Sequence, residues 1–162
     1  MDTYNVIISK RDRREYSAKP LADDLVHRIL QAGRMAGSSS NSQLVRYVVY
    51  RNRDNMKALM SHGRGTRPLE GAQLYVLALL KDDARDFDVG RGLQNMMIAA
   101  WAEGVISCPV GLQDAAADAV VGVPEGYHIS IGIAFGYPAE SAAAVESRPR
   151  IAFEELFHFE KW

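Results

Sequence analysis

The residues best suited to binding a ligand begin with a run of charged side chains, Lys10-Arg11-Asp12-Arg13-Arg14. Alternate members of such a run can converge on one phosphate, to which each arginine offers a pair of parallel hydrogen bonds. Charge runs of this length are more often solvated turns. By itself the run therefore indicates only a candidate anion site.

Two further segments carry groups of a similar kind. Residues 37–43 read Gly-Ser-Ser-Ser-Asn-Ser-Gln, and their hydroxyls and amides can hydrogen-bond the edge of a heterocycle and a polyol chain. Arg148-Pro149-Arg150 places two cations close to the C-terminus. Taken singly, a polar connector and a basic turn are the simpler interpretations of these segments.

The sequence argues against several other kinds of site. Cys108 is the single cysteine and the four histidines are scattered, so neither a disulfide nor a metal site is expected. The sequence contains no P-loop, dinucleotide-binding fingerprint or Gly-x-Ser-x-Gly motif. Cys108 lies in an apolar run without an adjacent basic group, so we expect a buried structural thiol and not a nucleophile.

Length and composition indicate an ordinary globular protein. The chain has 162 residues, which fits one domain over residues 1–162, and its net charge of −1 gives no global attraction to nucleic acid or an anionic membrane. No apolar run approaches the roughly 18 residues that span a bilayer, and the first 14 residues lack the apolar core of a signal peptide. The single cysteine favours a reducing compartment, so we expect a cytoplasmic protein. From its charge and hydropathy we expect neither nucleic acid nor a membrane as a partner.

Hydrophobic periodicity predicts the elements that must position these segments. A first helix is expected to carry residues 6–8, with Asp2 or Thr3 as its candidate cap. Further helices are expected over residues 21–35, 55–62, 88–103 and 114–121, with Asp23 and Asp24 as candidate caps of the first of these. Strands are expected over residues 45–50, 74–80 and 129–137, an apolar segment over 105–111, and a loop over 63–71. Helices interleaved with few strands indicate an α+β domain in which helices cover a small mixed sheet.

The C-terminal segment is rich in aromatic residues: Phe153, Phe157, Phe159 and Trp162. A chain of this size offers limited core volume for so many rings. We expect them to pack across a dimer interface, with packing on the chain's own core as the alternative.

In their order along the chain, these segments resemble the motifs of the nitroreductase family of flavoproteins. The family pattern Arg-Arg-Ser-x-Arg-x-Phe is matched by residues 10–16, and the pattern Ala-Pro-Ser-x-x-Asn-x-Gln-Pro-Trp by residues 36–45. Asp88-Val89-Gly90, Gln94-Asn95, Ala99-Ala100 and Gly104-Val105 are similar to the family's central helix, and Gly136-Tyr137-Pro138 and Arg150 complete the order. The resemblance covers nearly the whole chain.

The resemblance implies a three-layer α/β/α sandwich with a small mixed, mainly antiparallel sheet, in a domain-sharing homodimer with two FMN sites at the subunit interface. Lys10, Arg11 and Arg14, with Arg148 and Arg150, would hold the phosphate. Ser38, Ser39 and Asn41 would come from the partner subunit. Cys108, Pro109, Val110 and Gly111 would lie beside the isoalloxazine, largely through backbone groups, because a flavin face requires flat apolar walls.

The chain departs from the family pattern at several of these positions. Lys10 stands where arginine is common and Asp12 where serine is common, while Gly37, Leu44 and Val45 replace Pro, Pro and Trp. A carboxylate beside a phosphate is unfavourable. We therefore expect Asp12, as a member of the cofactor site, to pair with an arginine or to use backbone contacts.

The resemblance also implies an FMN-dependent oxidoreductase. NADH or NADPH would reduce the flavin, which would then reduce an electron-poor small molecule such as a nitroaromatic or a quinone. The flavin does the chemistry, so we assign no catalytic side chain. The alternatives are a flavin-binding or sensing protein with little turnover, and a helical interaction module whose basic segments meet an acidic partner.

Overall fold

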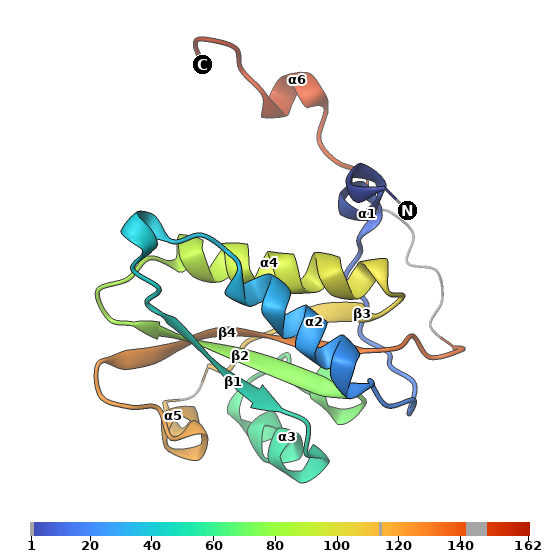
Figure 1. The fold of residues 1–162 in the computed structure, drawn as a ribbon, viewed down its shortest axis with the longest axis vertical. Helices are drawn as coiled ribbons and strands as arrows, with labels where there is room; N and C mark the ends of the chain where they lie inside the picture. Colours follow the sequence, from blue (N-terminus) through green and yellow to red (C-terminus); the bar gives the residue numbers. More distant parts are fainter. Residues whose placement is uncertain (1, 114, 142–148) are drawn as a thin grey trace.

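The computed structural model describes residues 2–113, 115–141 and 149–162, and its centre is a four-stranded sheet (Figure 1). The strands β1 (Val45–Tyr50), β2 (Leu74–Lys81), β4 (Tyr127–Gly136) and β3 (Ile106–Val110) lie in the order β1-β2-β4-β3, and each neighbouring pair is antiparallel. Among the described residues, parallel pairing is limited to an isolated bridge between Asp12 and Ser107. The predicted small, mainly antiparallel sheet is therefore confirmed, and its parallel part is this single bridge.

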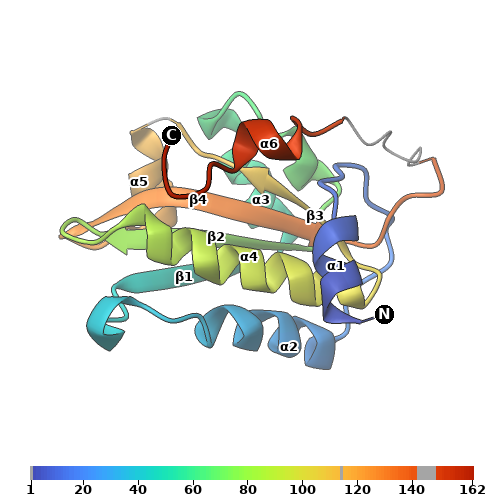
Figure 2. The same cartoon turned by 90° about the horizontal axis from the view of Figure 1, so that it is seen from above.

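Helices cover both faces of the sheet and complete the three predicted layers. The helices α2 (Asp23–Arg34) and α4 (Asp86–Ala102) lie on one face, and α3 (Arg53–Leu59) and α5 (Ala116–Val121) on the other (Figures 1 and 2). Val76 of β2 packs in the cluster of α2 and α4, whereas Leu77 packs with Met56 of α3. Because β2 is buried on both faces, its sequence is continuously apolar and not alternating.

Two glycines allow α2, α4 and β1 to approach closely. A Cβ atom on Gly33 would lie 2.0 Å from Cε of Met96, and one on Gly92 would lie 2.1 Å from the hydroxyl of Tyr47. A larger residue at either position would require the Met96 or Tyr47 side chain to move. No described helix, α4 included, is long and apolar enough to cross a membrane.

The helix starts test the capping predictions. Asp2 caps the helix α1 (Thr3–Ser9) by accepting a hydrogen bond from the Asn5 backbone, as expected. Asp23 and Asp24 are not caps, because the N-cap of α2 is Ala22, which makes no side-chain cap hydrogen bond. The two aspartates lie in the first turn instead, where their charge favourably meets the helix dipole.

Residues 63–71, predicted as a loop, are more ordered than expected. They contain a 3-10 helix, Arg67–Glu70, in which Leu69 is buried. Thr66 is also buried and donates from its hydroxyl to the carbonyls of Met60 at 2.6 Å and Gly63 at 3.0 Å. Because Leu69 enters the core and the Thr66 hydroxyl closes the turn, this segment is held against the sheet.

The C-terminal residues 149–162 form an arm that projects beyond α1, away from the sheet (Figure 1). The arm contains the short helix α6 (Phe153–Leu156), and all its residues are exposed, with Trp162 completely so. Its rings contact one another: the ring centroids of Phe153 and Phe157 are 4.6 Å apart. The alternative that this segment packs on the chain's own core is therefore wrong for the single protomer.

Candidate functional site

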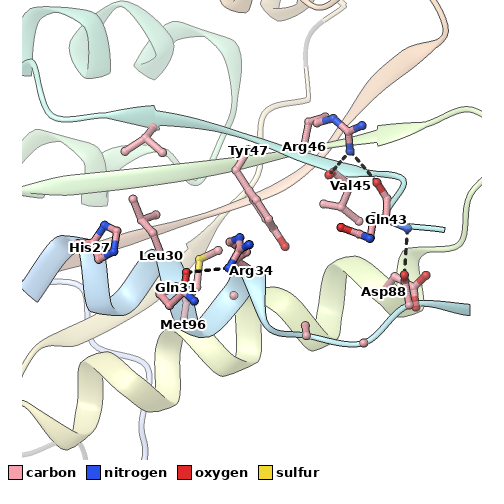
Figure 3. Close-up of a pocket in the computed structure, with 15 residues that line it drawn as sticks. His27, Leu30, Gln31, Arg34, Gln43, Val45, Arg46, Tyr47, Asp88 and Met96 are labelled. Atoms are coloured by element: carbon pink, nitrogen blue, oxygen red, sulfur yellow. Dashed lines mark hydrogen bonds between the residues drawn. The ribbon is translucent and has the colours of Figure 1, made fainter. Parts of the chain in front are cut away.

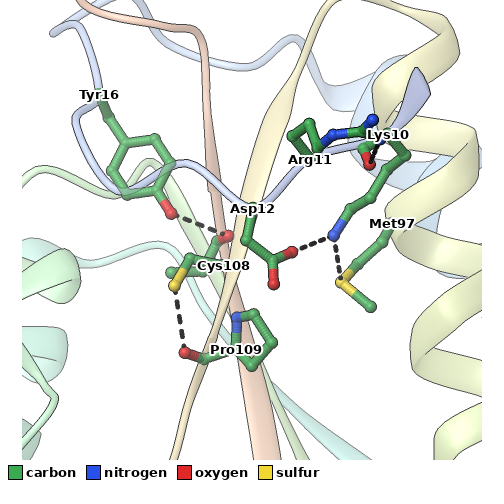
Figure 4. Close-up of polar contacts among 8 residues, drawn as sticks. Lys10, Arg11, Asp12, Tyr16, Met97, Cys108 and Pro109 are labelled. Atoms are coloured by element: carbon green, nitrogen blue, oxygen red, sulfur yellow. Dashed lines mark hydrogen bonds and ion pairs between the residues drawn. The ribbon is translucent and has the colours of Figure 1, made fainter. Parts of the chain in front are cut away.

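The segment that follows α1 lies against β3. Lys10 ends α1, and the chain then forms the bridge between Asp12 and Ser107, while the Arg13 N–H donates to the Ser107 carbonyl at 3.0 Å. Figure 4 shows Lys10, Arg11 and Asp12 beside Cys108 and Pro109 of β3. The structure thus brings residues 10–14 to Ser107, Cys108 and Pro109 of β3, which are nearly a hundred positions away in sequence.

Lys10 forms an ion pair with Asp12 at the centre of this contact (Figure 4). The Lys10 side chain is only 9% exposed, and its Nζ lies 3.4 Å from Sδ of Met97 on α4. Arg11 turns back and donates from Nη1 to the carbonyls of Ile8 at 2.8 Å and Lys10 at 2.9 Å. Asp12 was expected to pair with an arginine or to use backbone contacts. Its ionic partner is Lys10, and its backbone forms the bridge to Ser107 of β3.

Cys108 is buried, as the sequence predicts, and lies within reach of three charged side chains. Burial raises the pKa of its thiol, Arg14 and Lys10 oppose that rise, and Asp12 adds to it. The thiol is therefore neutral near pH 7, and it donates to the Pro109 carbonyl at 3.2 Å. The charges of Lys10, Asp12 and Arg14 therefore act on the Cys108 thiol, which places the basic segment close to this part of β3.

The rest of the β3 segment is a largely apolar wall. Val110 is buried, while Pro109 and Gly111 are half-buried. The hydroxyl of Tyr75 donates to the Val110 carbonyl at 3.0 Å and fixes the end of the strand. Tyr16 stands beside Cys108 and donates to the Ala134 carbonyl of β4 at 3.2 Å (Figure 4). A flat wall with few directed polar groups suits an aromatic ring system.

The structure adds residues that the sequence analysis missed. The turn at residues 62–66 packs on the end of β3, since a Cβ atom on Gly63 would lie 2.6 Å from the Gly111 carbonyl oxygen and the Gln113 N–H donates to the His62 carbonyl at 2.8 Å. Arg67 lines, with Arg14, a surface hollow of about 690 Å³. The signal for this contact was Gly63, where only glycine lets the two backbones approach.

The serine-rich loop lies elsewhere, at the N-terminal end of α4. It contains the 3-10 helix Ser39–Asn41, and the hydroxyl of Ser38 accepts a hydrogen bond from the Gln43 N–H at 3.0 Å. Ser40, Asn41 and Gln43 have positive φ values of 50°, 55° and 51°. Left-handed backbone at three residues without a glycine stores strain, which is commonest in ligand-binding segments.

The helix α4 separates this loop from the basic segment. Arg91 of α4 lies beside Gly37, where its Nη2 is 2.7 Å from a Cβ position, and Trp101 donates from Nε1 to the Ser9 hydroxyl of α1 at 3.0 Å. Ten residues of helix span about 15 Å. Figures 1 and 2 both show α1 and the loop toward opposite ends of α4. Ser38, Ser39 and Asn41 are thus not brought to residues 10–14 within one protomer.

A groove of about 400 Å³ lies between α2 and β1, which is an edge strand of the sheet (Figure 3). Tyr47 and Met96 stand at its centre, with His27, Arg34 and Arg46 on its walls. Of the predicted cofactor-binding residues, the groove contains only Ser38 at its margin. It is therefore a separate feature from the contact between residues 10–14 and β3.

The predicted C-terminal cations are not part of the contact in one protomer. Arg150 is exposed at the start of the arm and makes no hydrogen bond or ion pair within the described part of the chain. Arg148 lies outside the described residues. Their assignment to a phosphate stays a prediction.

Comparisons with known proteins agree with this arrangement. The family model described as "Putative TM nitroreductase" matches residues 2–161. The NADPH-flavin oxidoreductase of Vibrio harveyi is 26% identical, over 97% of this chain and 73% of the relative. The solved structure of the NADPH:FMN oxidoreductase from Vibrio harveyi complexed with NAD+ has a TM-score of 0.89 at 23% identity, over 99% of this chain and 77% of that chain.

A second solved structure matches almost end to end. The FMN-dependent nitroreductase of Clostridium difficile has a TM-score of 0.86 at 18% identity, over 98% of this chain and 99% of that chain. These structural likenesses establish a common fold, with helices on both faces of a small antiparallel sheet. Since the family model covers nearly every residue, the chain belongs to the nitroreductase family.

Proposed function

We propose that the protein is an FMN-dependent NAD(P)H oxidoreductase. The observation that carries the proposal is the contact of residues 10–14 with Ser107 and Cys108, from which the apolar segment 108–111 continues. Such a contact offers a phosphate site and a flat wall side by side, which is the combination that a flavin mononucleotide requires. The names of the relatives, a flavin oxidoreductase and an FMN-dependent nitroreductase, support the same class.

The residues present fit FMN chemically. Lys10, Arg11 and Arg14 would hold the phosphate, as cations do for a doubly charged anion. Beside them, the Ser107 hydroxyl is fully buried and has no hydrogen-bond partner among the described atoms, so a polar group is available at the same place. Pro109 and Val110 would lie along the ring. When bound, FMN supplies hydride acceptance from NADH or NADPH and reduction of an electron-poor small molecule.

The chain's own part in this reaction is to bind, orient and exclude water. The cations fix the phosphate end, and β3 fixes the plane of the ring through its backbone. The buried neutral Cys108 adds no charge beside the ring. We assign no catalytic side chain, because none of these groups needs to donate or accept a proton in the transfer of a hydride.

We propose further that the functional unit is a homodimer. The serine-rich loop and the basic segment lie toward opposite ends of α4, so a second copy is needed for Ser38, Ser39 and Asn41 to meet the same flavin. The apolar arm is the second support, because it exposes Ile151, Phe153, Leu156, Phe157, Phe159 and Trp162. Apolar surface of this extent on one short arm is typical of a protein interface. Arg150, at the base of the arm, would complete the phosphate site together with Arg148.

The test combines the visible absorption spectrum, the mass in solution and the rate of reduction. Purified protein incubated with FMN and desalted is expected to keep an oxidised flavin spectrum, to have the mass of a dimer, and to lose its visible absorbance in a stopped-flow mixture with NADH or NADPH. A protein that stays colourless contradicts the proposal. A yellow protein that neither nucleotide reduces contradicts the enzyme and supports the flavin-binding alternative.

A further inference from the structure

The ion pair between Lys10 and Asp12 occupies the position at which the flavin phosphate is proposed to bind. The Lys10 side chain is only 9% exposed, whereas Arg14 and Arg150 are exposed. Its ammonium group is held between the Asp12 carboxylate and Sδ of Met97, 3.4 Å away (Figure 4). Its charge is thus already neutralised within the chain.

The backbone fixes both partners of this pair. The Lys10 N–H donates to the Val6 carbonyl at 3.2 Å at the end of α1. Asp12 is held by its bridge to Ser107, and the next residue, Arg13, donates to the Ser107 carbonyl at 3.0 Å. The backbone of Asp12 therefore stays beside Lys10 while the chain is bridged to β3. An anion that binds to Lys10 must compete with the Asp12 carboxylate.

We propose that Asp12 sets how strongly this protein prefers FMN over riboflavin, by holding Lys10 so that this lysine adds little to the binding of the 5′-phosphate. This inference rests on the proposed function. A carboxylate that competes with a phosphate for one lysine, and repels that phosphate, lowers the affinity for the phosphorylated ligand alone. The protein then prefers FMN over riboflavin through Arg11 and Arg14, and less strongly than it would with Lys10 released.

The isoalloxazine wall makes the comparison with riboflavin informative. Both flavins present the same ring to the segment from Cys108 to Gly111, and only FMN presents a phosphate to Lys10. A change in the β3 wall would alter both affinities together. A change in the ion pair alters the ratio of the two, which measures the phosphate contribution separately.

The experiment is a set of flavin-fluorescence titrations on the full-length apoprotein. In the wild type, FMN is expected to bind more tightly than riboflavin because of Arg11 and Arg14, and the ratio of the two dissociation constants is the reference for the variants. Asp12→Asn keeps the side-chain shape and releases Lys10, so we expect FMN to bind about tenfold more tightly and riboflavin to change less than twofold. The gain should shrink as NaCl is raised, because it is electrostatic.

Two further variants identify Lys10 as the released group. Lys10→Met in the wild type is expected to change FMN binding little, whereas Lys10→Met added to Asp12→Asn should remove the gain. Asp23→Asn is the matched control. It also removes one carboxylate from an ion pair, here the pair between Asp23 at the start of α2 and Arg51. It should leave the ratio of the two flavin affinities unchanged. Circular dichroism spectra of all variants establish that each is folded.

The outcomes separate the inference from the function on which it rests. If the wild type binds neither flavin, the proposed function is wrong. If it binds both flavins but Asp12→Asn leaves the FMN-to-riboflavin ratio unchanged, or tightens both equally, the role of Asp12 is overturned and the flavin function stands.

Discussion

The indole nitrogen of Trp101 donates a hydrogen bond to the Ser9 hydroxyl at 3.0 Å and joins the end of α4 to the end of α1. Lys10 follows Ser9 directly, and it contacts Met97 one turn earlier on the same helix. Val6, buried on α1, is the apolar counterpart of this polar contact. The position of the basic segment on β3 thus depends on how α1 sits on α4.

Trp101→Phe tests this dependence, because it keeps an aromatic ring and removes the donor. We expect the free energy of unfolding to fall by about 1 kcal/mol, the usual net value of one hydrogen bond, and FMN binding to weaken several-fold. Urea unfolding and flavin titration measure the two effects.

Ser9→Ala removes the acceptor of the same hydrogen bond and provides the control. The double variant should be little worse than either single variant, since all of them lose the same interaction. If the two losses of stability simply add, the bond does not join α1 to α4 and the explanation is wrong.

Subunit mixing tests whether each flavin site is shared between two copies. Arg11→Ala with Arg14→Ala should weaken the site through the basic segment, and Ser39→Ala with Asn41→Ala should weaken it through the loop. Neither variant is expected to retain FMN after desalting. In a heterodimer of the two, one site carries all four changes and the other carries none. A heterodimer isolated with two affinity tags should therefore retain one flavin per dimer.

The parental homodimers, purified in the same way, are the controls for the mixing experiment. Flavin absent from the heterodimer would mean that the loop and the basic segment serve the same site within one chain. That result would remove the main argument for a shared site while leaving flavin binding itself untouched.

The sequence predicts elements whose patterns are local. Residues 45–50 are β-branched and aromatic, and the strand β1 has the same bounds. The bounds of β2 and α4 were also predicted to within about two residues. Buried elements are rich in apolar residues, and the apolar run of β2 and the apolar positions of α4 can be recognised in the sequence. The family motifs predicted the fold class, which the structural likenesses confirm.

Features that depend on contacts between distant segments could not be predicted in this way. Periodicity carries no information on strand order, so the sequence alone did not place β4 between β2 and β3. The pairing of Asp12 with Lys10 requires the extended backbone that the bridge to Ser107 imposes. The left-handed backbone at Ser40 and Gln43 is likewise set by the surrounding structure, since neither residue type favours it.

The aromatic arm provides a test of the dimer that does not depend on flavin. Phe153→Ser with Phe157→Ser changes two exposed rings that contact each other, and leaves Arg150 in place. Each ring buried at an interface contributes about 1.5–3 kcal/mol, so we expect the dimer dissociation constant to rise by a factor of 100 or more. Sedimentation velocity over a range of protein concentrations measures the shift.

Val120→Ser is the matched control for the arm, since Val120 is an exposed apolar residue of α5. It should leave the dissociation constant unchanged. A double variant of the arm that remains as dimeric as the wild type would show that the exposed rings do not form the interface.

The pKa of Cys108 predicts how thiol reactivity and stability change with pH. Burial raises this pKa, so the folded state favours the protonated thiol more strongly than the unfolded state does. The stabilisation is fully present below the ordinary thiol pKa of about 8.5 and is lost as pH rises through and above that value. Between about pH 8 and pH 10, the wild type should therefore lose more stability than Cys108→Ala. Burial also raises the pKa values of Tyr16 and Tyr75. Because Cys108 adds to the rise at Tyr16, the difference between the two slopes reports Cys108 together with its effect on Tyr16.

Alkylation of the thiol gives an independent reading of the same state. Only the thiolate displaces iodide from iodoacetamide, so folded wild type at about pH 8 should react far more slowly than the urea-unfolded chain. The two rates should approach each other only as pH rises. Arg14 is the main group opposing the rise in pKa, so Arg14→Ala should slow the reaction of the folded protein further. A folded thiol that reacts as fast as the unfolded one at pH 8 would place Cys108 in an open, cationic environment. In that case β3 would not form the buried apolar wall that the proposed flavin site requires.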